Sequence, residues 1–287
     1  MQFSDQKKGM LMAFIAVMFL TPDSLFIRLA NISSWNLIFY RGFIPFSVVF
    51  VSLLFVYKTN LIKKTISTGW RGIAYAIIFT ITNITFLISI ENTNVANTLI
   101  MIALAPMLSA VLSLIFLKEI PDRNTWIAII ITTLSVIYIF YDAMDTGHIL
   151  GNSLGLLTAL GLAVGAVIVR SAKKIDLVPS AMFGKLLVAL IAFYFADNLT
   201  LKDSDLAIVP LMCVMCVALP FVLVTIAPRF ITAAEVNLFF LLETILGPIW
   251  VWLVIKEQPS VETIAGGIII IITIAIHSAL SLKKHKT

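Results

Sequence analysis

Ionisable side chains stand inside apolar runs of this chain, and they carry its most informative chemistry. Glu243 lies within the run Leu-Phe-Phe-Leu-Leu-Glu-Thr-Ile-Leu, and Asp23 and Arg41 lie in two earlier runs. Holding a charge in hydrocarbon costs a few kcal/mol by insertion scales unless a partner or water compensates. Desolvation favours the neutral form of a carboxyl, so Glu243 is a candidate for binding a cationic substrate group or for taking up and releasing a proton. A hydrogen-bonded structural acid is the alternative.

Asp23 and Arg41 are predicted to pair. Counted at 1.5 Å per residue from the ends of their runs, both lie about 9 Å below the same membrane surface. A pair would offset the cost of burying each charge, and it would serve either as an outer gate or as a structural salt bridge. Pro22 favours the gate, because a proline inside a span frees a carbonyl and loosens the helix next to Asp23.

Uncharged polar and aromatic side chains supply a candidate cavity lining. Asn83 and Asn97 lie in two other apolar runs, and Asn237 lies in the same run as Glu243. Trp250 follows Glu243 by seven residues on the same predicted helix face. Together with Glu243 and Asp23, they are the candidate substrate- or proton-binding residues. Hydrogen bonding between helices and ordinary packing are the alternatives for these side chains.

Other reactive residue types are assigned to the scaffold. Lys185 is predicted near the inner end of its span, where its side chain can snorkel to the surface. His277 is interpreted as hydrogen-bonded scaffold, and Cys213 and Cys216 as small packing residues, although their spacing is C-x-x-C. The sequence holds no Walker loop, dinucleotide glycine fingerprint or metal-ligand cluster, so no cofactor and no metal are expected and an enzyme is not favoured.

Composition places these residues in a membrane. Apolar residues make up 60% of the 287 residues, charged residues 12%, and the mean hydropathy is +1.06, far from the range of a water-soluble chain. Apolar runs long enough to cross about 30 Å of hydrocarbon as helices occupy ten segments: 9–29, 35–57, 72–91, 95–117, 125–142, 151–170, 179–196, 206–227, 233–254 and 263–282. Because helices satisfy their own backbone hydrogen bonds, we predict an all-α polytopic membrane protein with ten transmembrane helices.

The basic residues predict the orientation of the chain. If the N-terminus is inside, 15 of the 20 Lys and Arg residues lie on or beside cytoplasmic segments, which places both termini in the cytoplasm. The formal net charge of +5 therefore reflects topology, and no nucleic-acid partner is expected. The first run is interpreted as a span because it is long and lacks the small-x-small site of a cleaved signal.

A repeated sequence suggests that the chain is duplicated. Lys118-Glu119-x-Pro121 and Lys256-Glu257-x-Pro259 each stand between two apolar runs, and the offset of 138 residues also aligns Ala105 with Glu243. Five spans in each half make the second half enter the membrane from the opposite face, so we predict inverted repeats at 1–146 and 147–287. Inverted repeats place a binding site near the midplane and change its access by rocking. Similar helix-end chemistry at the two sites is the alternative.

These features resemble a known family. Two five-span halves, each closing with an apolar helix, a Glu, a Pro and another apolar helix, are similar to the EamA-type exporters of the drug/metabolite transporter superfamily. The likeness covers nearly the whole chain and includes these segments: Thr21-Pro22-Asp23-x-Leu25-x-x-Arg28-Leu29, Tyr40-Arg41-Gly42, Val95-Ala96-Asn97-Thr98-Leu99, and Leu242-Glu243-Thr244-x-Leu246-Gly247-Pro248-x-Trp250-Val251-Trp252. The chain departs from the family where Lys precedes Glu119 and Glu257, since Gly is common there, and where Thr244 replaces a common Pro.

The resemblance implies a secondary transporter in the inner membrane of a bacterium, exporting a small polar or amphipathic metabolite of the amino-acid or organic-cation type by alternating access. Proton coupling is a further hypothesis. Uptake by the same fold, a channel and an intramembrane enzyme are the alternatives. The expected partners are the small-molecule substrate, protons and membrane lipid, and the chain is expected to act as a monomer or homodimer.

Overall fold

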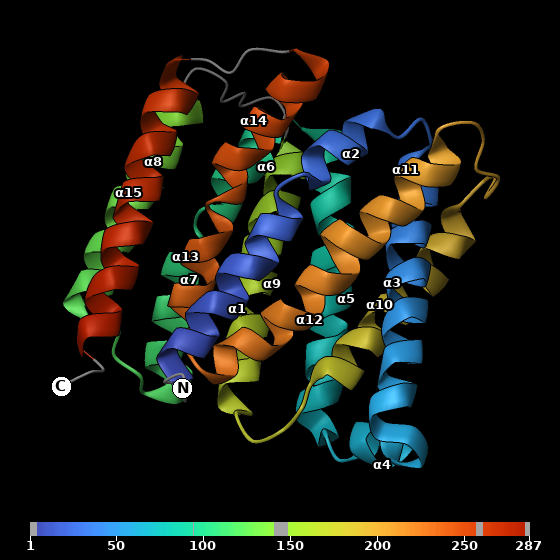
Figure 1. The fold of residues 1–287 in the computed structure, drawn as a ribbon, viewed down its shortest axis with the longest axis horizontal. Coiled ribbons are helices and arrows are strands. Elements are labelled where there is room, and N and C mark those ends of the chain that lie inside the picture. The colour runs from blue at the N-terminus through green and yellow to red at the C-terminus, as the bar shows by residue number, and fades with distance from the viewer. Residues whose placement is uncertain (1–4, 94, 141–148, 257–260, 285–287) are drawn as a thin grey trace.

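The computed structural model describes residues 5–93, 95–140, 149–256 and 261–284, and every regular element in these ranges is a helix (Figure 1). The helices are, in chain order, α1 (Asp5–Leu20), α2 (Asp23–Leu29), α3 (Ser34–Tyr57), η1 (Lys58–Asn60), α4 (Leu61–Ile66), α5 (Gly69–Asn92), α6 (Val95–Ile102), α7 (Ala105–Leu112), η2 (Ser113–Leu117), α8 (Arg123–Phe140), α9 (Ile149–Ser171), α10 (Val178–Phe195), α11 (Asp205–Met212), η4 (Cys213–Ala218), α12 (Leu219–Ile226), η5 (Ala227–Arg229), α13 (Ala233–Phe240), α14 (Glu243–Ile255) and α15 (Val261–Lys284). The predicted all-α class is confirmed.

Taken singly or joined to their neighbours, these helices form stretches that could cross a membrane. Within the described ranges, nine are long and apolar enough by length and composition, and a shorter apolar helix at Arg123–Ile139 falls on the fifth predicted span. The fifth predicted span extended to residue 142, and its last two residues lie outside the described part of the chain. The structure therefore supports a multi-pass membrane protein with an apolar helix at each of the ten predicted positions.

Several spans are interrupted near their middle. Pro22 separates α1 from α2, Pro106 stands at the start of α7, and Pro220 begins α12 after the π-helical segment η4. A proline removes a backbone donor and its ring clashes with the preceding turn, so a helix tends to break there. Such breaks leave backbone and side-chain polar groups near mid-span, where only a cavity or protein neighbours can satisfy them.

The two halves share their helix boundaries at the offset of 138 residues. That shift carries α6, Val95–Ile102, onto α13, Ala233–Phe240, and carries the first residue of α7 onto Glu243, the first residue of α14. It also carries Lys118 onto Lys256, and both lysines adopt the left-handed conformation, with φ of 55° and 67°. Each lysine is the residue that ends its helix, a position that favours glycine because glycine has no Cβ to clash. Glu257 and Pro259 of the second Lys-Glu-x-Pro sequence lie outside the described residues.

We expect Lys118→Gly to stabilise the protein. A left-handed residue with a Cβ costs about 1 to 2 kcal/mol, partly offset by the greater freedom of glycine in the unfolded chain, so a net gain of roughly 0.5 to 1 kcal/mol is expected. Thermal unfolding in detergent measures it. Lys8→Gly, an exposed right-handed position in the first turn of helix α1, is the matched control and should lower the unfolding temperature. If both variants lower it, strain at Lys118 is not what limits stability.

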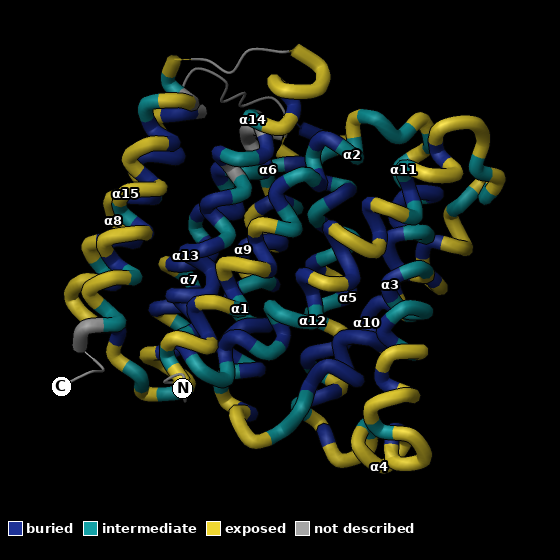
Figure 2. Tube along the Cα trace, viewed as in Figure 1, coloured by how far each residue is buried: buried dark blue, intermediate teal, exposed yellow. Residues whose placement is uncertain are grey.

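The helix packing pairs elements across the two halves. α3 packs on α10, α5 on α9, α7 on α13, α8 on α15 and α1 on α12. The α8–α15 pair lies at the edge of the molecule in Figure 1. Buried residues concentrate where the helices face one another, and exposed residues cover the outer helix surfaces and the ends (Figure 2).

The two ends of the helix bundle carry different charges. The end that holds the first turn of α1 and helix α4 is called the basic face (Figure 1). Its members are Lys58, Lys63, Lys64, Arg71, Lys118, Arg170, Lys173, Lys174 and Arg229. The opposite end includes Asp197, Asp203 and Asp205 together with Lys202 and Lys256. The basic face corresponds to the predicted cytoplasmic side.

Candidate functional site

The break between α1 and α2 positions an ion pair inside the bundle. Asp23 is the first residue of α2 and Arg41 lies on α3, and both side chains are buried. The guanidinium donates from Nη1 to Asp23 Oδ1 at 2.5 Å and from Nη2 to Oδ2 at 2.8 Å. This bidentate geometry is the strong form of an arginine–carboxylate pair, and it neutralises both charges locally.

Lys185 on α10 supplies a second buried cation. Its side chain is 1% exposed, and its ammonium donates to Asn83 Oδ1 on α5 at 2.5 Å. The same nitrogen lies 5.3 Å from the ring centre of Phe79 and 5.8 Å from that of Phe221. Ring faces attract a cation, so the two phenylalanines and the asparagine together hold an ammonium that has no carboxylate within ion-pair distance among the described residues.

Glycine at position 42 lets α3 and α10 approach closely enough to share this site. A Cβ at Gly42 would lie 2.6 Å from the Ala189 nitrogen and 2.8 Å from the Lys185 carbonyl oxygen. Backbone atoms cannot move aside as a side-chain tip can. Gly42 therefore fixes the spacing that brings Arg41 and Lys185 to one cavity.

Glu243 begins α14 directly after the break at residues 241–242. Its side chain is partly exposed, and within the described part of the chain no hydrogen bond or ion pair engages its carboxyl. The charged groups that act on it electrostatically are Asp23 and Arg41. Because those two charges already neutralise each other, Glu243 is the acid of this site that is available to a ligand.

These residues line one cavity of about 150 Å³. Its polar lining consists of Asp23, Arg41, Thr82, Asn83, Thr158, Lys185 and Glu243, and its aromatic lining of Phe79, Phe86, Phe221 and Phe240. The walls come from α1, α2, α3, α5, α6, α9, α10, η4, α12 and α13 and from the start of α14. An acid and an ammonium thus face a small, largely apolar space between helices of both halves.

A smaller cavity of about 70 Å³ shares several walls with the first, including Asn83 and Phe240, and reaches Asn237 on α13. The Asn237 amide donates to Ser109 Oγ at 2.6 Å and to the Ala233 carbonyl at 3.2 Å. Asn237 therefore lies beside the charged cavity, and its amide hydrogens are already engaged.

Two other predicted site residues are placed differently. Trp250 lies outside the cavity lining and donates from Nε1 to Thr21 Oγ1 at 3.0 Å, which ties α14 to the α1–α2 break. Asn97 belongs to α6, but its side chain lies outside the described residues. The structure thus brings Glu243, Asp23, Arg41 and Asn83 together and leaves Trp250 apart.

The prediction that Lys185 snorkels to the surface is wrong. The side chain lies in the middle of α10 and turns into the charged cavity. The position of Lys185 in the sequence indicates this placement. It is the seventh residue of the predicted span, so its Cα lies about 10 Å from the membrane surface, too deep for the ammonium to reach water easily. Thr82 and Thr158, which also line the cavity, carried no comparable signal.

His277 and the two cysteines have structural surroundings. His277 Nε2 lies 3.1 Å from Thr125 Oγ1, between α15 and α8. Cys213 and Cys216 are free and buried in η4, where Cys216 touches the cavity wall. Among the described residues, no group of three or more His, Cys, Asp or Glu side chains could hold a metal ion.

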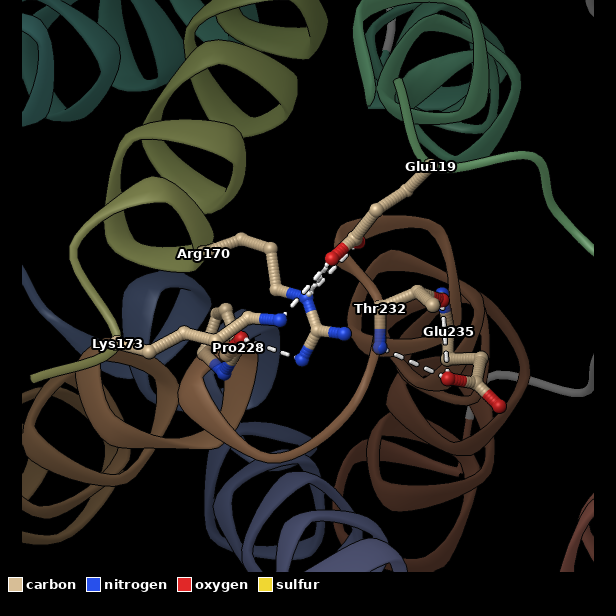
Figure 3. A network of polar contacts seen from close by, with 6 residues as sticks. All are labelled: Glu119, Arg170, Lys173, Pro228, Thr232 and Glu235. Carbon is tan, nitrogen blue, oxygen red and sulfur yellow. Dashed lines mark hydrogen bonds and ion pairs between the residues drawn. The ribbon is translucent and has the colours of Figure 1, made fainter. Parts of the chain in front are cut away.

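A polar network joins the helix ends at the basic face (Figure 3). Arg170, at the end of α9, donates from Nε to both Glu119 oxygens, at 2.9 and 3.1 Å, and Lys173 Nζ donates to Glu119 at 3.0 Å. Arg170 Nη1 also donates to the Pro228 carbonyl at 3.4 Å. Glu119, which follows the fourth span, is thus tied to the ends of the sixth and eighth.

The pKa of Glu119 is set more by its charged partners than by its burial. Burial acts to raise the pKa of this carboxyl, but the hydrogen bonds and positive charges of Arg170 and Lys173 outweigh burial and hold the pKa below its ordinary value of 4.5. The carboxylate is therefore ionised, and the network formed, at neutral pH.

A capping box begins the ninth span beside this network. Thr232 Oγ1 accepts from the Glu235 backbone at 3.2 Å, and Glu235 Oε2 accepts from the Thr232 backbone at 2.8 Å (Figure 3). The other Glu235 oxygen accepts from Gln6 at 2.9 Å and from Ser281 at 3.0 Å. The start of α13 is thereby fixed to α1 and α15.

Comparison with known proteins agrees with this architecture. The model of the EamA-like transporter family matches the chain twice, at residues 7–141 and 149–279. A solved crystal structure, described only as that of a protein, superposes with a TM-score of 0.80 over 96% of this chain and 98% of the other at 13% identity, which shows a shared fold. None of the curated proteins matches the chain.

The fold and the site define the class of this protein: a multi-pass helical membrane protein with a charged cavity between its helices. The chain belongs to the EamA-like transporter family. Its type is therefore that of a membrane transporter of the drug/metabolite superfamily.

Proposed function

We propose that this chain is a secondary transporter that exports a small metabolite of the amino-acid or organic-cation type by alternating access. The observation that carries the proposal is the cavity in which Glu243, free of any described partner, faces the same space as the ammonium of Lys185. Because Glu243 and Lys185 are not paired with each other, each can bind an oppositely charged group of a solute.

The charges favour a zwitterion over a simple cation. With Glu243 ionised, the cavity holds two positive and two negative side chains: Arg41 and Lys185, Asp23 and Glu243. A bound cation would leave this desolvated space with a net charge, whereas a zwitterion would leave it neutral. In the proposed complex, Glu243 accepts from the ammonium of the solute, Lys185 donates to its carboxylate, and the phenylalanine walls contact its apolar part.

Glu243 also provides a route to proton coupling. A proton and the solute ammonium would compete for the same carboxylate, so protonation would release the solute and deprotonation would permit it to bind. Exchange of protons for solute then needs no further titrating group. This coupling is part of the proposal.

The shared helix boundaries support inverted repeats as the basis of alternating access. The breaks in α6–α7 and α13–α14 fall at equivalent positions, and the helix pairs α3–α10, α7–α13 and α8–α15 each join equivalent spans of the two halves. Such a pattern is expected of two halves related by a pseudo-twofold axis that passes through the cavity region. Rocking about that axis would expose the cavity to one side and then to the other.

The Glu119 network is proposed to be the closed gate on the basic face. Its donors come from the second half and its acceptor from the first, so rocking of the halves must separate them. The Asp23–Arg41 pair lines the cavity itself, where it acts either as the outer gate or as a permanent part of the site.

Glu119→Gln is expected to open the basic face. The amide has no negative charge and one accepting oxygen in place of two, so it weakens the contacts with Arg170 and Lys173. The equilibrium should shift toward the conformation open on that side. Labelling of Val224→Cys, which lines the cavity, by a membrane-impermeant thiol reagent measures access, with Cys213 and Cys216 replaced by serine. We expect labelling from the basic face to rise severalfold, whereas Glu91→Gln, an exposed acid at the end of α5, should leave it unchanged.

The gate should respond to pH in one direction. Because the folded-state pKa of Glu119 lies below its ordinary value of 4.5, its contribution is present above that value and is lost as pH falls through the folded pKa. At each pH, labelling is divided by that of the same cysteine in the Glu119→Gln variant, because thiol reactivity itself falls with pH. This ratio should stay low and constant from pH 8 down to the ordinary value of 4.5 and rise only below it. Labelling that is already high at neutral pH would contradict the gate.

The proposed location is the inner membrane of a bacterium, with both termini in the cytoplasm, as a monomer or homodimer. The lysine and arginine residues of the basic face support this orientation. Reporter fusions at each terminus would test it.

The test of function compares metabolites inside and outside cells that express the wild type, Glu243→Gln or an empty vector. We expect a zwitterionic metabolite to accumulate outside only with the wild type. Accumulation inside would show an uptake carrier, and movement without saturation would show a channel. Turnover of a lipid-soluble substrate by the purified protein, with no gradient, would support an intramembrane enzyme.

A further inference from the structure

A surface hollow at the foot of α3 is separate from the transport cavity. It measures about 380 Å³ and lies on the basic face, at the turn formed by η1 and α4. Its lining consists of Val56, Tyr57, Asn60, Lys63, Lys64 and Ser67. None of these residues lines the cavity that holds Glu243, so transport leaves the hollow unexplained.

The hollow is strongly basic. Residues 58–71 contain Lys58, Lys63, Lys64 and Arg71 and no acidic residue. Among the described residues, no ion pair within 4 Å neutralises the three lysines. The carboxylate of Asp176 accepts from the Tyr57 hydroxyl and from the Val178 backbone, and it forms no described ion pair with these lysines. The positive charge is therefore available to an anion.

Apolar side chains surround the basic lining and face outward. Ile62 and Ile66, one helical turn apart on α4, are each 73% exposed, and Trp70 is 72% exposed. Phe55 and Val56, at the end of α3, are exposed as well. On α4 the isoleucines and the adjacent lysines form an amphipathic turn at the end of a span, where hydrocarbon meets the headgroup layer.

We propose that this hollow binds the phosphate of an anionic phospholipid, with the acyl chains along Phe55, Ile62 and Ile66. Lys63 and Lys64 supply the charge, and the Asn60 amide supplies a donor to the phosphate oxygens. A phospholipid with a cationic headgroup would bring its ammonium toward the lysines, so the site selects net negative lipids. The apolar rim favours a lipid over free phosphate, because phosphate alone would leave that rim uncovered.

Native mass spectrometry of the full chain in neutral detergent tests this, with phosphatidylglycerol or phosphatidylcholine added in equal amounts. We expect the wild type to retain phosphatidylglycerol and not phosphatidylcholine. The double variant Lys63→Gln/Lys64→Gln should bind phosphatidylglycerol roughly tenfold more weakly, since each basic residue near an anionic lipid contributes to affinity. Its unfolding temperature without added lipid should match that of the wild type.

The matched control removes the same charge from the same face. Lys8→Gln/Lys118→Gln changes two lysines that do not line the hollow, and both are exposed. We expect it to bind phosphatidylglycerol as the wild type does. Equal weakening in both double variants would overturn the proposal, as would equal retention of the two lipids. Inorganic phosphate is the third arm: if it raises the unfolding temperature as much as the lipid does, the hollow is a site for a free anion.

Discussion

Glu243→Gln is expected to lower the rate of solute export about 100-fold while the protein still folds. Removing one partner of a desolvated charge pair costs roughly 2 to 5 kcal/mol, and about 2.7 kcal/mol is a factor of 100. Glutamine keeps the size of the side chain and loses its charge, so the cavity should remain intact. Initial rates in proteoliposomes measure the effect.

The pH profile separates a proton-coupled acid from a binding acid. If protons and solute compete for Glu243, wild-type transport should vary with pH, and the residual transport of Glu243→Gln should not. Glu91→Gln removes an exposed acid at the end of α5 and should behave as the wild type. Full transport by Glu243→Gln with an unchanged pH profile would make Glu243 a structural acid.

Breaking the Asp23–Arg41 pair is expected to have the second largest effect. Asp23→Asn or Arg41→Gln leaves one buried charge without its partner, which typically costs 3 to 5 kcal/mol of stability. Because the contact is bidentate, with bonds of 2.5 and 2.8 Å, we expect the loss of stability to lie at the upper end of this range. We expect each single variant to unfold at a much lower temperature and to lose transport.

The charge-swapped variant Asp23→Arg/Arg41→Asp shows which role the pair has. Recovery of stability relative to the single variants is expected, because opposite charges again face each other. Recovery of stability without transport would indicate that Arg41 or Asp23 also contacts the solute or forms a gate. A double variant no more stable than the singles would argue against the pair as a stabilising contact.

Sequence alone predicted the membrane architecture because the bilayer leaves few choices. Long apolar runs must be helices, and the family resemblance agrees with both matched segments. The offset of 138 residues between Lys118 and Lys256 also aligns helix boundaries of the two halves, since both lysines end a helix in the same left-handed conformation. That conformation favours glycine at both positions.

The site was less predictable because side-chain direction is set by helix packing. Asp23 and Arg41 could be matched by depth alone, since an intramembrane charge needs a partner. Sequence predicts Lys185 at the surface because a long lysine side chain near the end of a span can reach water. The structure turns it inward, because α3 and α10 approach closely at Gly42 and the side-chain oxygen of Asn83 accepts from its ammonium. Trp250 shares a helix with Glu243, yet the break before α14 and the bond to Thr21 hold it outside the cavity lining.

Counterflow in proteoliposomes tests the central claim most directly. Vesicles containing the wild type or Glu243→Gln are loaded with an unlabelled apolar amino acid, and entry of the labelled solute is followed. Alternating access through the Glu243–Lys185 cavity predicts saturable uptake that the internal solute accelerates in the wild type and that Glu243→Gln loses. Uptake that neither saturates nor responds to internal solute, or that is equal in the two proteins, would contradict it.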